Sequence, residues 1–119
     1  VLVRAKNWAA AAEDLDRALK PNPVEYPSLW FFDAVANFNS KNLDAAEKSA
    51  REAVKVDAKH ENPKAEQLLG FILIQKRDIP GAVSSLRSYL KYSPQAPDAL
   101  NIQQQIVELE QAQAQPTQQ

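Results

Sequence analysis

Hydrophobic and polar residues alternate along this chain with helical spacing, and one version of the pattern occurs three times. The segments "KNWAAAAEDLDRAL", "KNLDAAEKSAREAV" and "KRDIPGAVSSLRSYL" begin at residues 6, 41 and 76. Within each segment apolar side chains recur every three or four positions, which places them on one face of a helix. Matched alanines stand at Ala11, Ala46 and Ala82, which are 35 and 36 residues apart. The pattern predicts three related amphipathic helices.

Residues that favour a helix start precede each of the three segments. Asn7, Asn42 and Asp78 stand just before the first apolar residue, and such side chains can accept a backbone N–H bond of the first turn. Pro80 falls in the first turn of the third helix, where the missing N–H costs little. We therefore expect each helix to begin directly after its capping residue.

A second type of helix alternates with the first. Residues 27–40 and 63–77 both begin with proline and end in polar residues, and a related start recurs at Pro97. Pro27, Pro63 and Pro97 are 36 and 34 residues apart, which is the same period. The second type (helix A) and the first type (helix B) then form hairpins of about 34 residues, the length of one tetratricopeptide unit.

These positions resemble the tetratricopeptide repeat family. Its helix B carries an alanine, a bulky residue four positions later and a closing proline. Two segments match this pattern, with Ala11, Leu15 and Pro23 in one and Ala82, Leu86 and Pro94 in the other. The middle segment departs from it, with Ala50 and Ala58 in the last two places. The family's helix A pattern is met in part by Trp30 and by Leu69-Gly70.

The resemblance implies an all-α fold, a right-handed α-solenoid of stacked helix-turn-helix hairpins. The expected division is a partial unit over 1–26, full units over 27–60 and 63–96, a capping helix over 97–112 and a disordered Gln-rich tail over 113–119. Helices A and B of a hairpin cross closely, so we expect small residues at the crossings. These positions are held by Ala11, Ala34, Ala46, Gly70 and Ala82.

We expect apolar residues to be covered differently at the two ends of the array. The chain starts with "VLVRAKNW", which has no initiator methionine and no signal-peptide organisation, so we expect an excerpt of a longer protein. Without a preceding helix A, Trp8, Leu15 and Leu19 would stay partly uncovered. The last helix is apolar at Leu100, Ile106, Val107 and Leu109 and should place one face on the array and one in water.

Composition and candidate chemistry argue against catalysis. The net charge of −1 supplies no field that recruits nucleic acid, and no apolar run nears the roughly 20 residues of a membrane span. Cysteine is absent and His60 is the only histidine, in a polar loop where we expect it to be solvated. The acidic residues of the B helices, such as Glu13 and Glu47, are expected on a solvated outer face. We therefore predict no enzyme, no metal site and no cofactor.

The family usually binds extended peptides or a partner's helix on the concave side, which the A helices line. The resemblance, together with the helical projection, implies a protein or peptide partner there. The residues expected to face it are Phe31, Val35, Phe38, Asn39, Lys64, Gln67, Phe71, Ile74 and Gln75, continued by Asn101, Gln105 and Glu108. Because A-helix aromatics also pack on the preceding helix B, helical spacing does not separate groove from core for the apolar members.

Chaperone-binding members of the family resemble one another in a clamp of basic and amide side chains that holds a terminal carboxylate. The corresponding positions here hold Phe32, Val35 and Leu68, and only Lys64 fits, so this clamp is not expected. Two alternatives stay open for the function. The chain could self-associate through its N-terminal face as a structural spacer, or it could be an accessory domain of a larger enzyme. An RNA-binding repeat is disfavoured by the charge.

Overall fold

Six helices make up the fold, and the part of the chain described by the computed structural model, residues 8–19 and 27–114, contains no strand. The helices are α1 (Trp8–Leu19), α2 (Pro27–Asn39), α3 (Leu43–Val56), α4 (Lys64–Gln75), α5 (Ile79–Tyr92) and α6 (Ala99–Ala114). This confirms the all-α prediction. The A helices are α2, α4 and α6, and the B helices are α1, α3 and α5.

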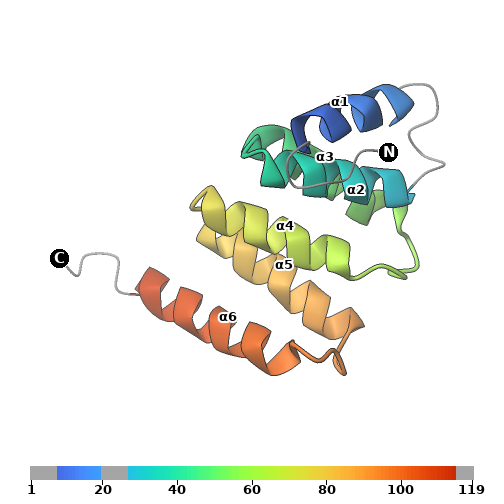
Figure 1. The fold of residues 1–119 in the computed structure, drawn as a ribbon. Coiled ribbons are helices and arrows are strands. Elements are labelled where there is room, and N and C mark those ends of the chain that lie inside the picture. The colour runs from blue at the N-terminus through green and yellow to red at the C-terminus, as the bar shows by residue number, and fades with distance from the viewer. Residues whose placement is uncertain (1–7, 20–26, 115–119) are drawn as a thin grey trace.

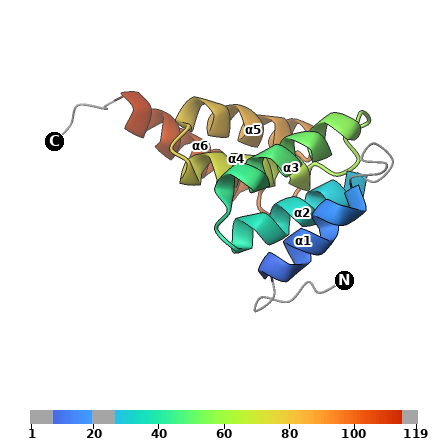
Figure 2. The same cartoon turned by 90° about the horizontal axis from the view of Figure 1, so that it is seen from above.

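Neighbouring helices stack in chain order from α1 to α6 (Figure 1). The most extensive contacts lie within the hairpins α2–α3 and α4–α5, while α1 packs on α2, α3 on α4 and α5 on α6. Seen from above, α5 lies beside α4, and α2 lies between α3 and α1 (Figure 2). The shortest of the three extents, 46 × 33 × 22 Å, corresponds to a thickness of two helices, since a helix with its side chains is about 10 Å across.

Small residues allow the helices to approach closely within each hairpin. The four predicted alanines, Ala11, Ala34, Ala46 and Ala82, are fully buried, as expected from the repeat. Gly70 of α4 is buried too, and a Cβ built there would lie 2.8 Å from Cγ and Cδ2 of Leu86 on α5. The α4–α5 crossing therefore depends on the missing side chain of Gly70.

The unusual Ala50 of the middle unit belongs to a core in which small residues face large ones. Ala34, Ala46 and Ala50 of the first full hairpin pack in one cluster with Leu69, Ile72 and Leu73 of α4. The larger α4 side chains fill the space that a leucine at position 50 would occupy. The bulk that the family pattern places at this position of helix B thus comes from side chains of the next hairpin.

The turn between helix A and helix B is the same in both full hairpins and does not use glycine. Lys41 and Arg77 both have positive φ, 67° and 68°, in the left-handed region. In each turn the N–H of the following residue returns to the carbonyl five positions back, Asn42 to Asn37 at 2.8 Å and Asp78 to Leu73 at 2.9 Å. A second hydrogen bond, from the N–H of the positive-φ residue to the carbonyl three positions back, completes each turn. These two hydrogen bonds satisfy the last carbonyls of the helix and form the Schellman motif at the ends of α2 and α4.

The predicted helix starts are confirmed in part. Asp78 accepts a hydrogen bond from the Gly81 N–H at 3.2 Å, and Pro80 lies in the first turn of α5. The side chain of Asn42 makes no capping bond, so the prediction for that residue is wrong. Asn7 and the tail residues 115–119 lie outside the described residues, and α6 itself continues to Ala114.

Two expectations about exposure are corrected by the packing of α1 and α6. Leu15 is buried, because α1 packs on α2 and its cluster includes Ala36 of that helix. The side chains of Trp8 and Leu19 lie outside what the structure describes. In α6 the face on the array is formed by Ile102 and Ile106, whereas Leu100 and Val107 point into solvent.

A charged contact joins the two full hairpins. Lys76, just after α4, donates to Asp44 Oδ1 and to Glu47 Oε1 of α3, both at 2.7 Å. The ammonium group holds the pKa of both carboxyl groups below their usual values. Glu47 is therefore only partly solvated and forms an interhelical ion pair, in contrast to the expected free outer face.

Candidate functional site

The predicted binding residues all belong to the layer of A helices, in which α2 and α4 lie side by side and α6 reaches the α4 cluster through one side chain. Helix α2 contacts α4 directly. Helix α6 joins them through Leu109, which packs against the cluster that contains Leu69 and Ile72 of α4. We call the surface formed by the predicted binding residues of α2, α4 and α6 the A-helix face.

Accessibility differs among the nine predicted residues. Asn39, Lys64 and Gln75 are exposed, whereas the remaining six are half-buried. Three of these six support the core: Phe38 packs against the cluster around Ala34, Phe71 against the cluster around Leu86, and Ile74 against both. From α6, Asn101 and Glu108 are exposed and Gln105 is half-buried.

Phe32 was not among the predicted binding residues, yet its side chain is 44% exposed, more than that of any other large apolar residue of α2. Its ring lies 5.9 Å from that of Phe31, tilted by 58°, so the two aromatics form one patch. The sequence signals for it are its place at a position that corresponds to the carboxylate clamp of chaperone-binding members and its position beside Phe31 in the run "WFF".

A polar joint holds α6 against the other helices at the edge of the A-helix face. Asp98, just before α6, accepts hydrogen bonds from Tyr89 Oη of α5 at 2.6 Å and from Gln67 Nε2 of α4 at 2.7 Å. These donors hold the pKa of Asp98 below its usual value. Burial, followed by the bond to Asp98, raises the pKa of Tyr89 to about 12. Gln67, a predicted ligand contact, is thus engaged within the protein.

His60 is not the solvated loop residue expected from the sequence. Its ring stacks on that of Tyr92 with centroids 3.7 Å apart, and Nδ1 lies 3.2 Å from Glu66 Oε1. Asp57 shapes the loop by accepting from the N–H groups of Glu61 and Asn62 at 2.9 and 2.8 Å. The backbone of His60 has a positive φ of 53°, in the left-handed region. The loop between the two hairpins is therefore tied to α4 and α5.

Buried polar residues occupy A-helix positions where the family pattern favours apolar ones. Asp33 accepts a hydrogen bond from Ser49 of α3, and the Asn37 amide donates to the Asp33 carbonyl at 3.0 Å. Glu66 takes the tryptophan position of α4 and is only 3% exposed. Departure from the family pattern at these sites was visible in the sequence, but their burial was not.

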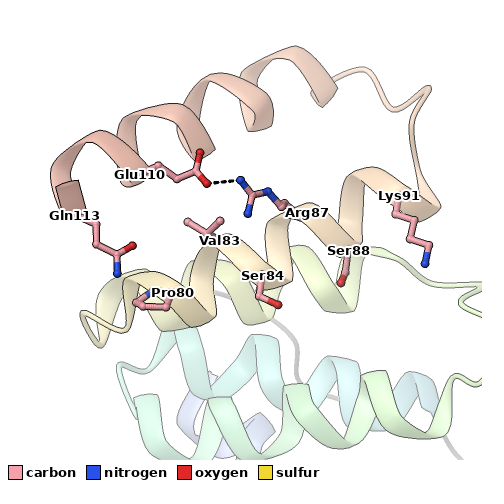
Figure 3. Close-up of a pocket in the computed structure, with 8 residues that line it drawn as sticks. All are labelled: Pro80, Val83, Ser84, Arg87, Ser88, Lys91, Glu110 and Gln113. Atoms are coloured by element: carbon pink, nitrogen blue, oxygen red, sulfur yellow. Dashed lines mark hydrogen bonds and ion pairs between the residues drawn. The ribbon is translucent and has the colours of Figure 1, made fainter.

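A hollow of about 490 Å³ lies between α5 and α6, away from the nine predicted residues. Figure 3 shows Arg87 of α5 and Glu110 of α6 meeting across it in an ion pair, above Val83. The pair satisfies both of these charges, and Lys91, which also lines the hollow, places its Nζ 5.4 Å from the ring centroid of Tyr92.

The described ranges contain no group of three or more histidine, aspartate or glutamate side chains placed to bind a metal ion. None of the helices in those ranges is both long and apolar enough to cross a membrane.

The comparison with known proteins agrees with the repeat architecture. The family model described as "Tetratricopeptide repeat" matches residues 1–64, more than half of the chain. No curated protein matches the sequence significantly. Tetratricopeptide repeats generally mediate protein–protein interactions without catalysis. Given that match and the stacked hairpins described above, this chain belongs to the tetratricopeptide repeat family.

Proposed function

We propose that this protein is a non-catalytic scaffold that binds a peptide or partner protein on its A-helix face. The observation that carries the proposal is the composition of that face, where an aromatic patch of exposed Phe32 and half-buried Phe31 is accompanied by exposed polar side chains at Asn39, Lys64 and Gln75. Apolar surface bordered by hydrogen-bonding groups is typical of protein interaction sites.

The binding energy would come from the aromatic end of the face. Burial of an exposed aromatic ring contributes about 25 cal/mol for each Å² of apolar surface removed from water. The polar side chains would set the orientation and register of the ligand through hydrogen bonds. Ion pairing contributes little, because Lys64 is the one exposed cation among the nine predicted residues.

Preorganisation supports this role. The half-buried Phe38, Phe71 and Ile74 anchor the face to the core, and the Asp98 joint links α4, α5 and α6. A face that is ordered before binding loses little conformational entropy when a ligand arrives. The mechanism is rigid display rather than folding on contact.

The test is selection of binders from a displayed library of random peptides, followed by affinity measurement on variants. We expect selected peptides to bind Phe32→Ser and Gln75→Glu variants at least about tenfold more weakly, a loss of about 1.4 kcal/mol each. Matched controls are Lys48→Glu and Lys55→Glu on exposed positions of α3, which should bind as the parent does. All four positions are at least one-third exposed, so the fold should persist, and circular dichroism checks this.

Peptides whose affinity falls with the α3 variants but not with Phe32→Ser would place the site elsewhere. A selection that yields no peptide binder would also contradict the proposal.

A further inference from the structure

The outer side of α6 carries the two most exposed large apolar residues among those the structure describes. Leu100 is 78% and Val107 48% exposed. They are seven residues apart and therefore lie on the same side of the helix. Gln103, Gln104 and Gln111 share that side and are exposed as well. We call these five residues the α6 strip.

A further hairpin helix does not fit the α6 strip at the spacing used elsewhere. The prolines at 63 and 97 set a shift of 34 residues, which maps Gly70 of α4 onto Gln104 of α6. At Gly70 even a methyl group would lie 2.8 Å from Leu86 of α5. The long Gln104 side chain thus bars the close crossing that α4 and α5 make, so another helix B cannot pack on α6 in the same way.

The strip is complementary to itself when two copies meet antiparallel. With a two-fold axis between Gln103 and Gln104, Leu100 faces Val107 of the second copy and Gln103 faces Gln104 of the second copy. Each glutamine amide carries both donors and an acceptor, so facing amides can bond to each other. This arrangement suits the wider spacing of a helix pair with large side chains in the interface.

Charge also favours a second copy as the occupant. The α6 strip contains no charged residue, although the chain is 24% charged. In the antiparallel register the nearby Glu108 and Glu110 face Ala99 and Pro97 of the second copy, so no like charges meet. A charged partner would gain nothing from this surface, whereas an identical strip matches it in apolar and amide positions.

We propose that two copies of this chain form an antiparallel dimer through the α6 strip. The contact is isologous, with the same surface used on both copies. Because only five side chains of each copy form it, we expect the contact to be small and the dimer to be reversible. Asn101 on the neighbouring side of α6 stays accessible, so the dimer would present two A-helix faces and bind bivalent partners more tightly.

Sedimentation equilibrium over a concentration series tests the proposal. The mass of the parent should rise from 13.3 kDa toward twice that value. Val107→Glu should hold the mass at that of the monomer, because it places a charge against Leu100 of the second copy. Asn101→Glu, which adds the same charge to α6 outside the strip, should dimerise as the parent does.

A compensating variant tests the antiparallel register. Leu100→Lys combined with Val107→Glu should restore the dimer, since each lysine then faces a glutamate of the second copy. In a parallel pair the same changes would place lysine against lysine. Spin labels add a geometric check, because the chain has no cysteine of its own. Labels at Gln111→Cys should be offset along the helix axis by about 20 Å more than labels at Gln104→Cys, at 1.5 Å per residue, and should therefore lie clearly farther apart.

A parent that stays monomeric up to about 1 mM, where even a dissociation constant of about 1 mM would show, overturns the proposal. Dimers that persist in Val107→Glu overturn it too, as they would use another surface. Failure of the double variant to dimerise, or equal distances at the two labelled positions, overturns the antiparallel arrangement.

Discussion

The Nδ1 atom of His60 lies 3.2 Å from Oε1 of Glu66, whose carboxylate is almost completely buried. No residue that the structure describes hydrogen-bonds to the other carboxylate oxygen, Oε2. Burial raises the pKa of Glu66, the contact with His60 opposes this rise, and the nearby Asp57 adds to it. The net result is a pKa above the usual value of glutamate.

A Glu66→Gln variant should be more stable than the parent at neutral pH. A raised folded-state pKa means that the contribution of Glu66 to stability is complete below its usual pKa and is lost as the pH rises through the raised pKa. At pH 7, which lies above the usual pKa of glutamate, the raised pKa means that the acidic side chain of Glu66 lowers the stability of the folded protein, and glutamine removes this cost. Urea midpoints at pH 7 should be higher for the variant, and the difference should shrink toward pH 4.

Glu61→Gln, an exposed position in the same loop, is the matched control and should leave the midpoint unchanged at both pH values. A Glu66→Gln variant that is weaker than the parent at pH 7 would show that the contact with His60 outweighs the burial of the charge.

Gly70→Ala should destabilise the protein although alanine favours helix. The helical preference contributes about 1 kcal/mol, and the overpacked contact with Leu86 costs about 1–3 kcal/mol. The free energy of unfolding should therefore fall by up to about 2 kcal/mol. In a Leu86→Ala background the obstruction is gone, and the same substitution should stabilise by up to about 1 kcal/mol. Equal effects in both backgrounds would disprove the role of this contact.

Ala46→Leu should lower the free energy of unfolding by about 1–3 kcal/mol, because Ala46 is fully enclosed by a cluster that includes Ala50 and Ile72. Ala10→Leu makes the same change at an exposed position of α1 and should stay within about 0.5 kcal/mol of the parent. Chemical denaturation of both variants measures the difference. Identical midpoints would contradict the packing described for the crossing of α2 and α3.

Tyr89→Phe should weaken the attachment of α6. The buried ring keeps its packing, but the hydroxyl bond to the Asp98 carboxylate is lost, at a cost of about 1.5–3 kcal/mol. Since the pKa of Asp98 is lowered, this stabilisation is present above the usual pKa of aspartate and is lost as the pH falls through the lowered value. The gap between parent and variant should accordingly narrow in acid.

Amide hydrogen exchange locates the effect of Tyr89→Phe, which should accelerate exchange in α6 more than in α3. Tyr92→Phe removes a hydroxyl from an exposed tyrosine of the same helix and should change stability by less than about 0.5 kcal/mol. Uniform acceleration across all helices would argue against a local joint.

The repeat was readable from the sequence because its causes are local. Apolar spacing of three and four residues defines the helices, and the buried alanines recur at the helix crossings with a period of 35 and 36 residues. Each of these patterns needs only a few neighbouring positions to be recognised. The family and the all-α fold followed from them, and so did the stacking of hairpins.

The candidate site was readable only in part, because an A helix is covered on more than one side. Helical spacing assigned Phe38, Phe71 and Ile74 to the binding face, yet neighbouring helices half-bury them, while Phe32 at the edge of the face is more open. Spacing along a helix gives the side of the helix on which a residue lies. It does not say how much of that side the adjacent hairpins bury.

The sequence by itself thus determined the repeat period, the helix types and the small residues at their crossings. The tertiary structure decided the environment of the polar residues: Glu66 is buried beside His60, Asp98 joins three helices, and Leu100 is left in solvent. These outcomes depend on contacts between segments up to 31 residues apart, as in the Gln67–Asp98 bond. Such contacts exist only after the hairpins have stacked, so no local pattern of residues records them.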